Sequence, residues 1–124
     1  MFDPFSRCGQ SLSAKSSFTI SDRDKYSLVL RQALSFSREM ASNELELIIV
    51  ADIFAGAVCM VCDHNLRETM AEFVDADHQI EACEESLRKL NLCPEGLPEF
   101  IRKVPNALSE IIRRQREGFH YIKV

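Results

Sequence analysis

The residues of this sequence that are best suited to chemistry are four of its five cysteines, Cys59, Cys62, Cys83 and Cys93. Four thiolates form a ligand set for Zn²⁺ or an iron–sulfur cluster. In zinc ribbons, however, each pair is separated by two residues, and the second pair here is separated by nine residues. Because free cysteine is also among the most buried residue types, we interpret these four as core residues and expect no cofactor. A metal-binding helical protein is the alternative interpretation.

A second group of residues could support acid–base chemistry or bind a metal. Its members are Asp52, Asp77, His78, Glu81 and Glu84. Helical spacing turns Asp52, Asp77 and Glu84 inward and Glu81 outward, but the paired Glu-x-x-His motif of di-iron bundles is absent. We therefore interpret these carboxylates as paired residues at the edge of a core, and all three histidines as surface or helix-end residues. The sequence also lacks a nucleophile elbow and a P-loop, so we expect no enzyme.

The charge is distributed unevenly along the chain. The net charge of −4 divides into +2 for residues 1–43, −8 for residues 44–92 and +2 for residues 93–124. The basic residues of the last segment are concentrated in Arg102, Lys103, Arg113, Arg114 and Arg116. This group could contact phosphate, which makes a small DNA-binding regulator the second alternative. Since the acidic middle offers these residues an internal partner, we expect ion pairs within or between chains rather than nucleic-acid binding.

Length and composition indicate one domain in a reducing compartment. The chain has 124 residues, of which 46% are hydrophobic and 27% charged, with only four Gly and four Pro. That scarcity of turn residues favours helices. An odd number of cysteines and the absence of a secretory signal predict a cytoplasmic protein, and the longest apolar run is too short and too charged to predict a membrane span.

The hydrophobic pattern predicts an all-α fold, a compact bundle of four to five helices within 21–124, with a flexible N-terminal arm over 1–20. The predicted elements are helices at 22–41, 45–62, 66–92, 98–103 and 105–117, and a strand or extended tail at 119–124. The β-branched residues Ile48, Ile49, Val50 and Ile53 also suit a strand, but the length of the apolar run favours a helix.

A fold made of these helices favours a function in binding another protein at its surface. We expect a protein–protein interaction module, an adaptor, chaperone-like or regulatory protein, that binds another protein through the acidic helix. Its predicted partner-binding residues are the anchors Leu66, Met70 and Phe73 and the charged Glu68, Glu72 and Asp75. An apolar helix at 45–62 and an overlong helix at 66–92 are hard to cover within one chain, so we also expect a homodimer.

Overall fold

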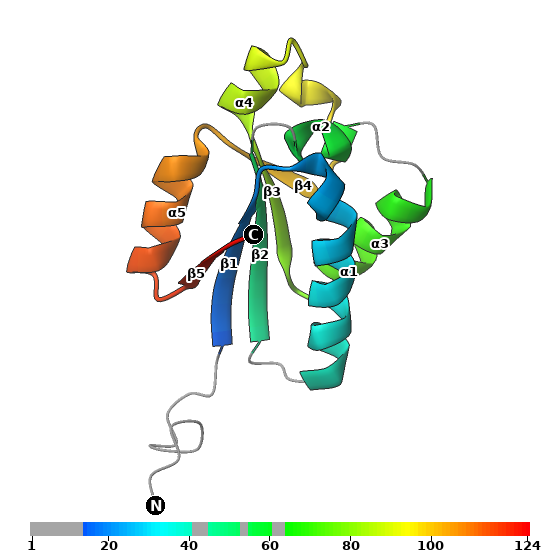
Figure 1. Ribbon diagram of the computed structural model, residues 1–124, viewed down its shortest axis with the longest axis vertical. Coiled ribbons are helices and arrows are strands. Elements are labelled where there is room, and N and C mark those ends of the chain that lie inside the picture. The colour runs from blue at the N-terminus through cyan, green and yellow to red at the C-terminus, as the bar shows by residue number, and fades with distance from the viewer. Residues whose placement is uncertain (1–13, 41–44, 53–54, 61–63) are drawn as a thin grey trace, which may run out of the picture.

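The protein is built around a five-stranded, wholly parallel β-sheet (Figure 1). The computed structural model describes residues 14–40, 45–52, 55–60 and 64–124. The strands are β1 (Ala14–Ile20), β2 (Leu45–Ala51), β3 (Gln79–Cys83), β4 (Ile101–Val104) and β5 (His120–Lys123). Their order across the sheet is β4-β3-β2-β1-β5, so the last strand lies beside the first. The predicted all-α bundle is therefore wrong, and the fold is α/β.

Helices cover both faces of this sheet and one of its ends. They are α1 (Arg23–Met40), α2 (Ala55–Met60), α3 (His64–Asp75), α4 (Glu84–Lys89), the 3-10 turn η2 (Pro94–Gly96) and α5 (Ala107–Arg116). Figure 1 shows α1 and α3 on one face, α5 on the other, and α2 and α4 at the end where the strands finish. None of the described helices is both long enough and apolar enough to span a membrane.

Strand β2 accounts for the apolar run that suggested a central helix. It is buried on both faces: Leu47, Ile49 and Ala51 belong to the core under α1 and α3, whereas Ile48 and Val50 belong to a second core under α5. A parallel strand covered by helices on both faces is a near-continuous hydrophobic run, without the alternation of a surface strand. The run of β-branched residues thus indicates a strand. The helix predicted over 45–62 is wrong for residues 45–51, which form β2, and only Ala55–Met60 within that range is helical, as α2.

The long helix predicted over 66–92 is three elements. Helix α3 ends at Asp75, β3 follows at Gln79 and α4 begins at Glu84. The turn between α3 and β3 passes through Asp77, whose φ of 68° lies in the left-handed region and ends the helix. Glu81, which helical spacing turned outward, lies on a central strand and is fully buried.

The two ends of the domain also differ from a helical bundle. Residues 14–20, predicted as part of a flexible arm, form β1 in the interior of the sheet, while residues 1–13 lie outside the described residues. The helix predicted at 98–103 is replaced mainly by β4. Helix α5, the stop at Gly118 with its φ of 97° and the strand at β5 agree with the prediction.

His78 joins three elements on the α1 side of the sheet. The backbone N–H of Leu47 donates to its Nδ1 at 3.1 Å, so Nε2 carries the proton and donates to Oγ of Ser37 at 2.7 Å. Burial lowers the pKa of His78 despite the negative charges of Asp77 and Glu46. The imidazole is therefore a neutral structural link. His78 was predicted to be a surface or helix-end residue, but it is buried and directly precedes β3.

Candidate functional site

A polar hollow of about 250 Å³ lies where β2, β3 and β4 end. Its lining comes from the residue after β2, the last residue of β3, helix α4 and the start of α5: Asp52, Cys83, Glu85, Ser86, Lys89, Asn106, Ala107 and Leu108. In a parallel sheet the carboxyl ends of all strands lie at the same end of the sheet, and open α/β proteins bind ligands at that end. The hollow is thus formed by segments that are far apart in the sequence and that the topology brings together.

Hydrogen bonds tie the walls of this hollow to one another. Ser86 Oγ donates to Asp52 Oδ1 at 2.6 Å, and Asn106 Nδ2 donates to Glu85 Oε2 at 2.7 Å. Lys89 Nζ lies 3.2 Å from Glu85 Oε1. The bond from Asn106 and the charge of Lys89 lower the pKa of Glu85, which favours its carboxylate form. Two carboxylates and one ammonium group therefore line the hollow, and the ammonium group of Lys89 pairs with Glu85.

Asn106 has a second role, because it also begins α5. Its Oδ1 accepts hydrogen bonds from the backbone N–H groups of Leu108 at 2.9 Å and Ser109 at 3.2 Å. This is the geometry of a helix N-cap. One side chain thus fixes the start of α5 and, through Glu85, the position of α4.

Cys83 contributes the only thiol of this lining. It is 3% exposed, and it packs with Ile48, Val50 and Ala107 in the core under α5. As the last residue of β3, Cys83 is held by the sheet and not by a loop. The hollow is thus lined by apolar side chains and a thiol, together with the polar and charged side chains that we call its rim: Asp52, Glu85, Ser86, Lys89 and Asn106.

A buried charged layer lies between β3 and α5, next to Cys83. Arg114 Nη2 donates to Glu81 Oε2 at 2.8 Å and to Gln79 Oε1 at 3.0 Å, and Arg114 Nε donates to Glu110 Oε2 at 2.9 Å. Glu81, Glu110 and Arg114 are all buried. The basic residues at this end of the chain thus include one that pairs inside the domain with the acidic middle segment.

The two buried carboxyl groups of this layer differ in their proton affinity. Burial and a hydrogen bond with Glu110 raise the pKa of Glu81 to about 7, even though Arg114 opposes the shift. Burial alone would raise the pKa of Glu110, but its hydrogen bonds with Glu81, Arg113 and Arg114 lower it to about 2. The Oε1 atom of Glu81 has no donor among the described residues, and a protonated Glu81 can instead donate to the carboxylate of Glu110. Below about pH 7 the pair therefore holds one proton, mainly on Glu81.

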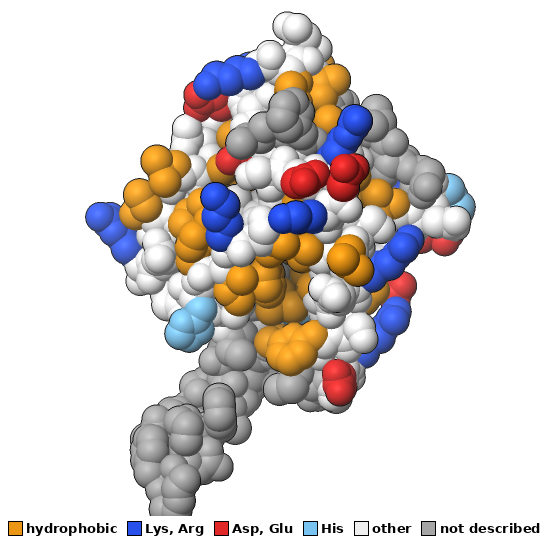
Figure 2. Space-filling model, in the orientation of Figure 1, with side chains coloured by type: hydrophobic (Ala, Val, Ile, Leu, Met, Phe, Trp, Pro, Cys, Tyr) orange, Lys and Arg blue, Asp and Glu red, His pale blue; other side chains and the backbone are white. Residues whose placement is uncertain are grey.

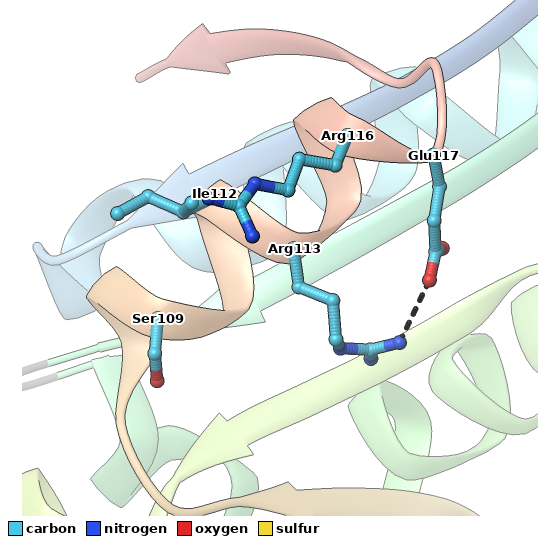
Figure 3. Close-up of a pocket in the computed structure, with 5 residues that line it drawn as sticks. All are labelled: Ser109, Ile112, Arg113, Arg116 and Glu117. Atoms are coloured by element: carbon cyan, nitrogen blue, oxygen red, sulfur yellow. Dashed lines mark hydrogen bonds and ion pairs between the residues drawn. The ribbon is translucent and has the colours of Figure 1, made fainter.

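A wider hollow of about 480 Å³ lies along the outer side of α5 (Figure 3). Its lining residues, Ser109, Ile112, Arg113, Arg116 and Glu117, belong to α5 or to the residue that follows it. In Figure 3, Arg113 and Glu117 point toward each other, and their atoms Nη1 and Oε2 are 2.9 Å apart. A surface that one helix supplies alone has no opposing wall, so we do not take it as the ligand site.

Three of the four cysteines of the alternative metal-binding interpretation lie in the described residues, and the fold places them apart from one another. Cys59 belongs to the core on the α1 side and donates to the Tyr26 hydroxyl at 3.3 Å, whereas Cys83 lies in the core under α5. Cys93 is exposed, and its thiol donates to Glu95 at 3.0 Å. Cys62 lies outside the described residues. No group of three potential metal ligands occurs in the part of the chain that the structure describes.

The predicted partner-binding residues divide into two groups. The anchors Leu66, Met70 and Phe73 are buried on the inner side of α3, so they are part of the core and a partner cannot reach them. Glu68, Glu72 and Asp75 lie on the outer side, where Glu68 pairs with His64 and Glu72 with Arg38. The acidic face therefore exists without the apolar anchors that it was expected to flank.

Sequence reasoning missed most of the residues around the polar hollow. Asp52 and Cys83 were noted, but as parts of other sets, and Ser86 and Asn106 were not singled out. A short β-branched run followed directly by Asp52 is the signal that could have identified the end of a buried strand. The convergence of this residue with Asn106 depends on strand order, which the local pattern does not contain.

The site and sheet define the class of protein as an open parallel α/β fold, and comparisons with solved structures agree. A protein of unknown function from Methanobacterium thermoautotrophicum, MTH1491, superposes with a TM-score of 0.73 at 22% identity, covering 90% of this chain and 99% of its own. The conserved protein BT1422 of unknown function from Bacteroides thetaiotaomicron gives 0.67 at 12% identity, with 93% and 98% covered.

The ychN protein from E. coli gives a TM-score of 0.66 at 11% identity and covers 90% of this chain and 99% of that one. At these identities the likeness establishes the fold alone. No protein-family profile matches the chain. No curated protein matches it in sequence.

Proposed function

We propose that this protein binds a small polar molecule in the hollow at the carboxyl ends of β2, β3 and β4, against the thiol of Cys83. The observation that carries the proposal is the convergence of Asp52, Ser86 and Asn106 from three separate segments on one hollow. Carboxylates of Asp52 and Glu85 around the rim favour a ligand that carries hydrogen-bond donors or a positive charge.

The size and rigidity of the hollow also support a small ligand. Its volume of about 250 Å³ lies below the range that drug-sized molecules occupy. The bonds from Ser86 to Asp52 and from Asn106 to Glu85 hold the carboxylates in place before a ligand arrives. Preorganisation of this kind reduces the entropy lost on binding. The proposal includes a reducing cytoplasmic location, because a free thiol would persist there.

The test compares two buried cysteines that differ in one respect. Cys83 is 3% and Cys59 0% exposed, but only Cys83 lines the hollow. Iodoacetamide, a small polar amide, is added to the folded protein, and modification at each site is followed by peptide mass mapping. We expect the exposed Cys93 to react first, Cys83 at an intermediate rate and Cys59 only on unfolding. Equal protection of Cys83 and Cys59 would show that the hollow admits no such molecule.

A second measurement identifies the ligand class. A panel of small amines, amino acids and polyhydroxy compounds is screened for a rise in melting temperature and for protection of Cys83 from iodoacetamide. The double variant Asp52→Asn, Glu85→Gln removes both rim charges with little change of shape. Cationic compounds should lose their effect on this variant. A compound that stabilises the wild type and the variant equally binds elsewhere.

A further inference from the structure

The two edges of the sheet differ in how they are protected against pairing. The middle of β4, at one edge, carries the exposed basic residues Arg102 and Lys103. Charged residues of this kind prevent an edge strand from pairing with another chain. The middle of β5, at the other edge, carries Tyr121 and Ile122. Among the described residues β5 pairs only with β1, so its outer edge is available.

An apolar groove runs beside the open edge. It has a volume of about 260 Å³ and lies between α1 and the two strands β1 and β5, lined by Phe18, Val29, Gln32, Ala33, Phe36 and Val124. Phe36 is 45% and Ile122 42% exposed. Figure 2 shows hydrophobic side chains gathered in the middle of this face, where the chain ends in Figure 1. An apolar surface next to a free strand edge is typical of an interface.

Strand register fixes which side chains of β5 face the groove. Ile122 lies beside Phe18, which lines the groove, so Ile122 is on the α1 side. Tyr121 lies beside Ser17 and Lys123 beside Thr19, which places both on the α5 side. Successive residues of a strand point to opposite faces, and this alternation restricts how a second β5 can pair with the first.

We propose that a second copy of this chain pairs with β5 edge to edge, in antiparallel orientation, around a two-fold axis at Ile122. Such an axis, perpendicular to the sheet, leaves the α1 side of both copies on the same side. Only residues of the same side can then stand opposite each other, so the axis passes through a residue and not between two residues. Tyr121 and Ile122, in the middle of β5, are the two positions that pair most of the strand.

The axis at Ile122 gives the better contacts. It sets Ile122 against the partner's Ile122 at the lips of the two apolar grooves. It also sets Lys123 opposite the partner's Tyr121, and the two lysines are not directly opposed. The other axis would pair Ile122 with the partner's His120, an exposed polar residue. The surface is therefore self-complementary, which favours a second copy over an unrelated peptide. Ten strands form one continuous sheet in this dimer.

The first test measures the mass of the full chain in solution by size-exclusion chromatography with light scattering. We expect a dimer for the wild type and a monomer for Ile122→Lys, with the dimer dissociation constant raised about 100-fold by the lost apolar contact and two opposed charges. The matched control is Ile112→Lys, which changes the same residue type at a nearly equal exposure, 45% against 42%, on α5. It should leave the dimer intact. A monomeric wild type, or a dimer unaffected by Ile122→Lys, overturns the proposal.

The second test reads the register directly. Residues opposite each other in an antiparallel pair have Cα atoms about 4.5–5.5 Å apart, which is within disulfide range. Ile122→Cys should therefore form a cross-linked dimer under mild oxidation, identified by mass as two tryptic peptides 117–123 joined through position 122. Ile112→Cys, a thiol at a position of nearly equal exposure on α5, should not. If Ile122→Cys joins only to other cysteines, or cross-links no faster than Ile112→Cys, the two-fold axis does not lie at β5.

Discussion

Replacing Glu81 by glutamine tests whether the layer under α5 holds a proton. Glu81 is 0% exposed, and its pKa in the folded protein is about 7 against an ordinary value of 4.5. Below pH 4.5 the folded and unfolded chains both carry the proton. Between 4.5 and 7 only the folded chain keeps it, so this group's stabilising contribution is lost as the pH rises through that window. A shift from 4.5 to about 7 corresponds to about 3 kcal/mol of unfolding free energy.

Glutamine has nearly the same shape as protonated glutamic acid and, like it, is uncharged. Its amide can donate toward Glu110 and its oxygen can accept from Arg114, as the neutral carboxyl group does. We expect Glu81→Gln to match the wild type near pH 5 and to exceed it at pH 8 by up to about 3 kcal/mol. Urea unfolding at pH 5, 6, 7 and 8 gives the difference between the two proteins, in which the contributions of other titrating groups cancel. The control is Glu99→Gln, at an exposed carboxylate.

The result that refutes this reasoning is a difference that does not change with pH. A constant loss of stability from pH 5 to pH 8 would mean that Glu81 is ionised throughout and pairs with Arg114 as a simple buried salt bridge. Breaking such a pair costs about 3–5 kcal/mol because one charge stays buried without its partner. The two descriptions thus predict opposite signs at pH 8, and a single unfolding curve at that pH separates them.

Three further expectations concern the frame around the site. The ring of His78 should be neutral with its proton on Nε2 at pH 7.5, as read from nitrogen chemical shifts by NMR, and a proton on Nδ1 would contradict the bond from Leu47. Because burial lowers the pKa of His78, its contribution to stability should fall as the pH drops below 6.5. Asn106→Ala should lower the unfolding free energy measured in urea by about 0.5–2 kcal/mol. Asn106→Ser should restore most of this loss, because serine can still cap α5 although it cannot make the bond to Glu85. Equal losses in the two variants would mean that the cap contributes nothing. Gly118→Ala should cost about 1 kcal/mol through its φ of 97° alone, since nothing lies within 4 Å of an added Cβ, and an unchanged melting temperature would contradict this strain.

The sequence predicted those elements whose pattern has one interpretation. Helix α1 has a regular apolar face with Tyr26, Leu30 and Leu34 buried, and the carboxylate of Asp22 accepts from the N–H of Asp24 at its start. The stop at Gly118 needs a residue that tolerates positive φ. Both features are local, so a window of a few residues contains all the information required.

The prediction of the central elements was wrong because two structures produce the same pattern. A continuous apolar run such as 45–51 fits a buried helix and a buried parallel strand equally well, and length was a poor guide because the run continues beyond β2 into α2. Glu81 is a stronger example. An acidic residue in a helical context is expected outside, and only the distant Arg114 makes its burial possible.

The candidate site could not be predicted for the same reason. Asp52, Cys83 and Asn106 meet because β2, β3 and β4 are adjacent in the sheet. Strand order is a property of the whole chain, and the residue types near each strand end do not reveal it. The chemistry of each side chain could therefore be read from the sequence, but its contacts in the fold could not.

The strand order has a consequence for synthesis on the ribosome. A growing chain can pair β1 with β2, and then β2 with β3, as soon as each strand emerges. The apolar residues Ile48 and Val50 nevertheless stay uncovered until α5 is complete, and the second edge of β1 stays open until β5 is made. Nascent chains that stall before residue 107 should therefore be bound by holding chaperones or aggregate, whereas release of the last eighteen residues closes both surfaces almost at once.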